Sequence, residues 1–198
     1  MTKPKLLIFL HGFGFDKDNN KESIQQLADG LGVEYFSFNG LFNSQRERGG
    51  YSRFGLDRVT KKSIFDDKFY KSIDYINFTI NKQLEKRNIE RKDIILCGRS
   101  QGAFMAIYKG LTNDEKCHSI ISLCGFAREG ININIKSMPE IIRLEAKNDT
   151  VLSQERKESY KKLQEDGIKI KYILDKESNH DEISRKGINK IIEKYNRK

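Results

Sequence analysis

Short apolar runs alternate along the chain with longer, mainly polar segments. Six of these runs are rich in Ile, Leu and aromatic residues, and several lack a strict apolar–polar alternation. This pattern is typical of strands that are covered on both faces of a sheet. The predicted strands are residues 5–10, 33–38, 93–97, 119–123, 140–145 and 168–174.

Between these runs, apolar residues recur with the period of an α-helix. The two clearest helical faces are Ile73, Ile76, Ile80 and Leu84, and Ile188, Ile191, Ile192 and Tyr195. Further helices are predicted over residues 21–31, 101–111 and 153–166, the last one stopped by Gly167. Alternating strands and helices predict an α/β fold whose mostly parallel sheet, of about six to seven strands, is flanked by helices. Ligands of such folds gather beyond the carboxyl ends of the strands.

The length of 198 residues and the absence of a Pro/Gly/Ser-rich linker predict a single domain over residues 1–198. Residues 39–67 lack clear periodicity, so we expect a functional loop beside the ligand-binding edge of the sheet. Residues 125–139 carry no helical pattern. We therefore expect no lid there and a rather open pocket.

The formal net charge of +9 raises the possibility of an anionic partner. Lys and Arg are scattered among Asp and Glu, however, and no nucleic-acid motif accompanies them, so we interpret most of the charge as solvated surface. No nucleic-acid partner is expected, and at most peripheral membrane contact. A basic protein of a nucleic-acid or membrane surface stays the least favoured alternative.

The cysteines and the N-terminal apolar run bear on the compartment. Cys97, Cys117 and Cys124 are odd in number and lack metal-ligand spacing, which favours reduced thiols in an intracellular protein. Residues 6–10 are too few for a signal peptide or a membrane span, and no small-residue cleavage site follows them. These observations predict a cytoplasmic protein.

Gly98, Ser100 and Gly102 form a G-x-S-x-G motif, with a predicted strand before it and a helical pattern after it. In this context the serine lies in a sharp strand-to-helix turn that lifts its hydroxyl above the sheet. The turn crowds the positions two before and two after the serine, which cannot easily carry a β-carbon. The sequence therefore nominates Ser100 as a nucleophile; the alternative is a glycine-rich turn with a solvated serine.

A serine hydroxyl needs a base, and the base needs an orienting carboxylate. His180, in KESNHDEIS, directly follows the last predicted strand, whereas His118 precedes a strand and falls at the opposite edge of the sheet. Asp149, in RLEAKNDTVLS, follows the strand of residues 140–145, and Glu145 ends that strand. We favour Asp149 because a residue four positions into the loop can curl back toward the histidine more easily. The alternatives are a helix-capping aspartate, a solvated loop histidine and, for Glu145, a surface charge.

The segment FLHGFGFD after the first predicted strand supplies the other half of the candidate site. Its HG-x-G turn is of the kind whose backbone N–H helps to bind an oxyanion, together with the amide that follows the nucleophile. This nominates the amides of Phe13 and Gln101. His11 precedes the serine in the chain, and its expected part is to shape the turn.

These segments together resemble the phospholipase/carboxylesterase group of α/β-hydrolases, which includes the acyl-protein thioesterases. The resemblance extends over nearly the whole chain and rests on FLHGFG, GGYSRFGLD, GRSQG, KNDTVLS and SNHDEIS. It implies the α/β-hydrolase fold and hydrolysis of a small-molecule or lipidic carboxylic ester or thioester by Ser100, His180 and Asp149. It implies neither a metal nor an organic cofactor, and a monomer or homodimer is expected. A catalytically silent binding protein with the same fold is the main alternative.

The sequence departs from that family near the expected substrate pocket. The family commonly has an aromatic residue at the position of Arg99, a tryptophan at that of Arg53, and His-Gly where Glu145 and Ala146 stand. Arg53, Phe54 and Arg99 are the predicted substrate-binding residues. With Arg46 and Arg48 in the same loop, the arginines predict either an anion-preferring pocket mouth or simply a soluble surface.

Overall fold

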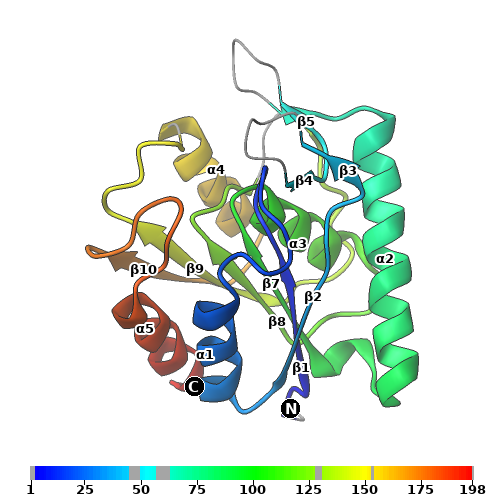
Figure 1. Ribbon diagram of the computed structural model, residues 1–198, viewed down its shortest axis with the longest axis horizontal. Helices are drawn as coiled ribbons and strands as arrows, with labels where there is room; N and C mark the ends of the chain where they lie inside the picture. The colour runs from blue at the N-terminus through cyan, green and yellow to red at the C-terminus, as the bar shows by residue number, and fades with distance from the viewer. Residues whose placement is uncertain (1–2, 45–49, 57–62, 128–130, 153, 198) are drawn as a thin grey trace.

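A six-stranded sheet forms the centre of the computed structural model, with the strand order β10-β9-β8-β7-β1-β2 (Figure 1). The structure describes residues 3–44, 50–56, 63–127, 131–152 and 154–197, with the backbone alone at residues 155–157. All neighbouring strands of this sheet are parallel. The strands are β1 (Leu6–Leu10), β2 (Glu34–Ser37), β7 (Ile94–Arg99), β8 (Ser119–Leu123), β9 (Glu140–Ala146) and β10 (Ile170–Asp175).

All six predicted strands are therefore present, and the predicted parallel α/β architecture is confirmed. The largest boundary differences are two residues: β7 ends at Arg99 rather than at residue 97, and β10 begins at Ile170 rather than at residue 168. Gly167 has a positive φ of 88°, and the Ile168 amide donates to the Leu163 carbonyl at 2.9 Å. This closing turn of the preceding helix uses Ile168, so the strand starts later.

The helices also lie where the apolar pattern predicts them. They are α1 (Lys21–Leu31), α2 (Asp67–Arg87), α3 (Gln101–Thr112), α4 (Gln154–Glu165) and α5 (Arg185–Asn196), with a 3₁₀ turn η1 (Arg91–Asp93) before β7. Ser153, the first residue of the predicted fourth helix, lies outside the described residues. None of the described helices combines the length and apolar character needed to span a membrane.

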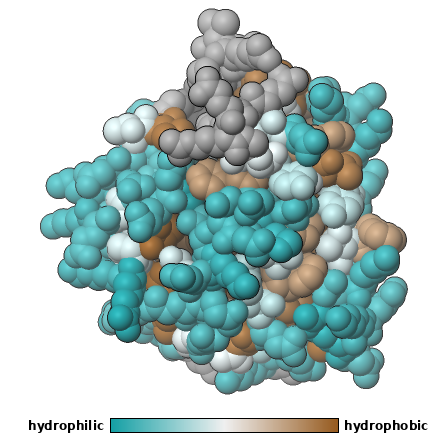
Figure 2. Space-filling model, viewed as in Figure 1, coloured by the Kyte–Doolittle hydropathy of each residue, from teal (hydrophilic) through white to brown (hydrophobic). Residues whose placement is uncertain are grey.

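The central sheet is buried on both faces, which explains why its strands lack an apolar–polar alternation. In β1, Leu6, Ile8 and Leu10 face a core shared with α2, α3 and α4. Leu7 and Phe9 face a second core shared with α1 and α5. Hydrophilic residues cover most of the face seen in Figure 2, in agreement with charge spread over a solvated surface.

Residues 39–67 contain more regular structure than the sequence predicts. In the described part, β3 (Phe42–Asn43) pairs with β4 (Tyr51–Ser52), and β5 (Gly55–Leu56) pairs with β6 (Ser63–Ile64), both antiparallel. Strands of two residues have no detectable period, which is why the pattern missed them. Both ladders lie at the carboxyl edge of the central sheet, where the loop was expected (Figure 1). Residues 131–139 hold no helix, as predicted, and residues 128–130 lie outside the described chain.

Candidate active site

Ser100 occupies a strained turn between β7 and α3. Its backbone has φ 49° and ψ −117°, a conformation that costs a non-glycine residue roughly 1–3 kcal/mol. A β-carbon on Gly98 would collide with the backbone of Gly102, and one on Gly102 would collide with the carbonyl of Leu10. The predicted need for glycine on both sides of the serine is therefore confirmed sterically. The Ser100 amide donates to the Leu123 carbonyl at 3.0 Å, which ties the turn to β8.

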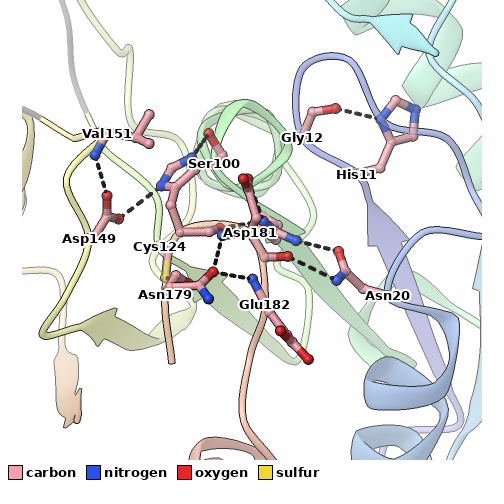
Figure 3. A network of polar contacts seen from close by, with 12 residues as sticks. His11, Gly12, Asn20, Ser100, Cys124, Asp149, Val151, Asn179, Asp181 and Glu182 are labelled. Atoms are coloured by element: carbon pink, nitrogen blue, oxygen red, sulfur yellow. Dashed lines mark hydrogen bonds and ion pairs between the residues drawn. The ribbon is translucent and has the colours of Figure 1, made fainter. Parts of the chain in front are cut away.

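Three predicted site residues from three different loops meet at this turn (Figure 3). His180 Nε2 lies 3.0 Å from Ser100 Oγ, and His180 Nδ1 lies 2.9 Å from Asp149 Oδ2. Asp149 follows β9 and His180 follows β10. Because a carboxylate only accepts hydrogen bonds, Nδ1 carries the proton and Nε2 presents a lone pair to the serine hydroxyl.

Asp149 is held in place by its own loop. Its Oδ1 accepts from the amides of Val151 at 2.9 Å and Leu152 at 3.1 Å, which leaves Oδ2 for His180. Burial alone would raise the pKa of Asp149, but the hydrogen bonds from His180, Leu152 and Val151 lower it below the ordinary value. The carboxylate is thus ionised at neutral pH.

Glu145, the rival acid, takes part in a different contact. Its Oε2 lies 2.5 Å from Arg143 Nη2 within the same strand. The guanidinium of Arg143 in turn lies over the ring of Tyr160, 4.1 Å from its centroid. The geometry therefore places Asp149, rather than Glu145, against the imidazole.

The loop that carries His180 is organised by Asp175, a residue that the sequence reasoning missed. Asp175 Oδ2 accepts from the Ser178 amide (2.9 Å) and hydroxyl (2.6 Å) and from the Ser184 hydroxyl (2.8 Å), while Oδ1 contacts Lys190 Nζ at 2.8 Å. Burial would raise the pKa of Asp175, but these partners hold it far below the usual range. An aspartate at a strand end followed by serines at turn spacing was the available signal.

His11 shapes the turn after β1, as predicted. Its Nε2 accepts from the Gly40 amide at 2.8 Å, so Nδ1 carries the proton and donates to the Gly12 carbonyl at 2.8 Å. Burial, aided by the nearby charge of Arg53, lowers the pKa of His11 to about 3, and the ring is neutral. A β-carbon built on Gly12 would lie 3.4 Å from Ser100 Cβ, so this turn runs directly beside Ser100.

Gln101 links the start of α3 to the segment around β4 and β5. Its side-chain oxygen accepts from the Arg53 amide at 2.9 Å, and its side-chain nitrogen donates to the Phe54 carbonyl at 3.0 Å. Since α3 begins at Gln101, the backbone N–H of Gln101 has no acceptor inside the helix and points out of the helix end. The Phe13 amide lies in the neighbouring turn, two residues after His11.

The predicted substrate-binding side chains do not form an open, basic pocket mouth. Arg53, Phe54 and Arg99 are each only 1% exposed. Phe54 packs in an aromatic cluster, with ring centroids 5.6–5.8 Å from those of Phe65, Phe69 and Phe104. Both guanidinium groups are buried and hydrogen-bonded to protein, and the substrate-binding role of Arg53, Phe54 and Arg99 stays a prediction. Arg46 and Arg48 lie outside the described residues.

The three cysteines and His118 are not part of the hydrogen-bonded chain of Ser100, His180 and Asp149. Cys97, Cys117 and Cys124 are free, buried thiols whose pKa values are raised by burial. Cys124 Sγ lies 3.7 Å from the Asn179 carbonyl, in the loop of His180. His118 lies 3.1 Å from the Tyr195 hydroxyl and stacks on that ring, as expected for a structural histidine.

Comparisons with known proteins agree with this architecture. The structure resembles esterase PE8, with 22% identity, 97% of this chain and 91% of that chain covered, and a TM-score of 0.81. Arabidopsis thaliana SOBER1 (16% identity, 98% of each chain covered, TM-score 0.78) and the Bacillus cereus carboxylesterase (15%, 98% and 89%, 0.77) share the fold as well. The sequence profile of the phospholipase/carboxylesterase family matches residues 2–194, nearly the whole chain. The chain therefore has the α/β-hydrolase fold and belongs to the phospholipase/carboxylesterase family.

Proposed function

We propose that this protein is a serine hydrolase that cleaves carboxylic esters or thioesters through Ser100, His180 and Asp149. The observation that carries the proposal is the continuous hydrogen-bonded chain from Asp149 Oδ2 through both ring nitrogens of His180 to Ser100 Oγ. Membership of the phospholipase/carboxylesterase family supports hydrolysis of carboxylic esters as the reaction class. The names of two structural neighbours, an esterase and a carboxylesterase, point the same way.

In the proposed reaction, Ser100 Oγ attacks the acyl carbon while His180 Nε2 takes the hydroxyl proton. Asp149 keeps the proton of the ring on Nδ1 and stabilises the imidazolium that forms. The tetrahedral intermediate then collapses, and His180 returns the proton to the departing alcohol or thiol. A water molecule, activated by the same histidine, attacks the acyl-enzyme and releases the carboxylic acid. This sequence uses no metal or organic cofactor.

The amides of Phe13 and Gln101 are the proposed donors to the oxyanion of that intermediate. Both belong to turns that run beside Ser100, and the Gln101 amide is also at the positive end of the α3 dipole. Donors fixed in advance stabilise developing charge without reorganisation, and each is worth about 10²–10³ in rate. The side-chain contacts of Gln101 hold its backbone in this orientation.

The test compares Ser100→Ala with Ser23→Ala, a half-buried serine of α1. We expect a fluorophosphonate probe to label the wild type and Ser23→Ala at one site, and to leave Ser100→Ala unmodified by intact mass. Ser100→Ala is also expected to lose turnover of a short-chain p-nitrophenyl ester, with at most ~10³–10⁴-fold acceleration over water remaining. Near wild-type turnover in Ser100→Ala would remove the nucleophile assignment. A folded wild type that neither reacts with the probe nor hydrolyses esters would instead support a silent binding protein.

A further inference from the structure

Arg99, the residue before Ser100, connects three separate segments of the chain around the candidate site. Two of its partners, Asn20 and Asp181, are labelled in Figure 3. Its Nε donates to the carbonyl oxygen of His180 at 2.9 Å, and its Nη2 donates to the same oxygen. Its Nη1 donates to Asn20 Oδ1 at 2.5 Å, and Nη2 lies 3.2 Å from Asp181 Oδ1. The guanidinium therefore joins the turn of Ser100, the start of α1 and the loop between β10 and α5.

The surroundings of this guanidinium restrict its position further. Its central carbon lies 4.9 Å from the ring centroid of Phe15, so one face is covered by an aromatic ring. Burial lowers the pKa of Arg99, and the charge of Asp181 opposes that change. A buried arginine with hydrogen bonds on all three nitrogens has little freedom to move, because each donor would lose its acceptor.

Asn20 gives independent evidence that this contact has a purpose beyond local stability. It occupies the N-cap position of α1, where an Asn side chain normally accepts from a helix amide, yet within the described chain its side chain makes no such bond. Instead its oxygen accepts from Arg99, and its nitrogen lies 3.4 Å from the Asp181 carbonyl. Asn20 also adopts a left-handed backbone with φ 65°. The side chain of Asn20 therefore binds Arg99 instead of capping α1.

We propose that Arg99 is a positioning residue that sets the distance between His180 Nε2 and Ser100 Oγ. The inference rests on the proposed function above. Arg99 is covalently attached to Ser100 and hydrogen-bonded to the main chain of His180, so one side chain fixes both partners of the proton transfer. Asp149 orients the ring of His180, whereas Arg99 anchors the backbone from which the ring projects. A displacement of about 1 Å between reacting groups can cost ~10²-fold in rate.

The central experiment measures kcat and KM of Arg99→Met, with Arg91→Met as the matched control. Arg91 is also a buried arginine, 6% exposed and hydrogen-bonded to Asn81 at 2.7 Å, but it lies before β7, at the opposite edge of the sheet. Arg99→Met is expected to lower kcat ~10–100-fold with KM changed less than about threefold. Arg91→Met is expected to lower stability while kcat stays within about threefold of wild type. A folded Arg99→Met with wild-type kcat overturns the proposal, and so does an equal loss of kcat in both variants.

Three further variants keep the proposal testable if Arg99→Met does not fold. Arg99→Lys keeps the charge but lacks a planar fork, so it cannot serve His180 and Asn20 together, and we expect it to stay impaired. Asn20→Ala removes one partner and is expected to lower kcat by a smaller factor. In Arg99→Ala, added methylguanidinium is expected to restore part of the lost kcat. Wild-type kcat in both Arg99→Lys and Asn20→Ala would overturn the assignment.

A spectroscopic readout separates this inference from the proposed function. The Nδ1–H proton of His180, hydrogen-bonded to Asp149, should give a strongly downfield NMR resonance in the wild type. We expect this resonance to broaden or disappear in Arg99→Met and to persist in Arg91→Met and Ser100→Ala. Its persistence in Arg99→Met would overturn the positioning role whether or not the protein hydrolyses esters. Failure of the wild type to react with a fluorophosphonate would count against the proposed function alone.

Discussion

Arg99 and Arg53 are equally buried, yet their surroundings differ completely. Arg99 has acceptors on every nitrogen, drawn from two segments around the candidate site, the start of α1 and the loop of His180. Arg53 donates from Nη2 to the Phe38 carbonyl at 3.1 Å, but its Nε and Nη1 have no partner among the described residues. The ring of Phe38 also faces the guanidinium, with its centroid 5.0 Å away.

This difference shows that burial alone does not indicate whether a charged side chain supports the candidate site. Burial lowers the pKa of both arginines, because each charge has lost water. At Arg99 the lost solvation is replaced by charge-assisted hydrogen bonds to groups near Ser100. Among the described residues, the lost solvation of Arg53 is replaced only in part, so we expect Arg53 to be a net cost to the folded state.

The largest expected effect concerns the acid on the other side of His180. Asp149→Asn should lower kcat by roughly 10²–10⁴, because an amide no longer holds the imidazole in the tautomer that accepts the serine proton. Glu145→Gln should lower kcat much less, since Glu145 contacts Arg143. Steady-state kinetics on one activated ester would check both variants. The opposite ranking would assign the orienting acid to Glu145. It would also contradict the site geometry from which the role of Arg99 is inferred.

Asp175 is the anionic counterpart of Arg99, a buried charge with partners on all sides. Asp175→Asn should lower the free energy of unfolding by about 2 kcal/mol at pH 7, because an amide cannot satisfy Ser178, Ser184 and Lys190 together. The folded-state pKa lies below the unfolded value of about 3.9, so this stability is present above that pH and is lost as the pH falls below it. Urea denaturation of both proteins at pH 7 and pH 3 measures the difference. A gap that stays constant between the two pH values would contradict the assignment.

Arg53→Met should test the other side of the comparison. Replacing a poorly paired buried charge with an apolar side chain of similar volume is often neutral or stabilising, so we expect a gain of about 0–2 kcal/mol. The Ser72 hydroxyl and Gln101 contact only the backbone of Arg53 and should be unaffected. Denaturant unfolding measures the change. A decrease in the free energy of unfolding above about 2 kcal/mol would mean that the guanidinium contacts stabilise the folded state.

The smallest expected effect concerns substrate choice. If Arg53 lies outside the substrate pocket, Arg53→Met should leave the ratio of kcat/KM for two matched esters, one neutral and one with a remote carboxylate, within about twofold of wild type. The two esters are compared at low and high salt, because a contribution from fixed charge shrinks as salt rises. A tenfold, salt-sensitive loss of preference for the anionic ester would return Arg53 to the pocket.

The architecture and the meeting of the three site residues follow from local sequence patterns. Each central strand and each long helix has a periodicity or an apolar run that identifies it. Parallel strands place their carboxyl ends at one edge, so Ser100, Asp149 and His180 had to approach one another once each was assigned to a strand end. Their catalytic roles stay predictions.

The partners of the arginines could not be predicted in this way. Arg99 meets Asn20 and His180 across 79 and 81 positions of the chain, and no spacing rule connects residues so far apart. Sequence position alone suggested that both arginines line the pocket mouth, and only packing shows where a long side chain ends. Arg99 lies in the G-x-S-x-G motif, at the end of a strand that is covered on both faces. This position was the one hint in the sequence that its side chain would be buried.

The anchoring of the His180 loop determines when the site can be completed during biosynthesis. The turn of Ser100 uses β1, β7 and β8, all of which lie within the first 123 residues. The loop of His180, in contrast, depends on Lys190 of α5, and α5 packs against α1, where Ile192 lies against Gly30. A chain emerging from the ribosome can therefore form its strained serine turn well before the loop of His180 is anchored. Under the proposed function, the growing polypeptide would hold its serine without a base until α5 docks on α1.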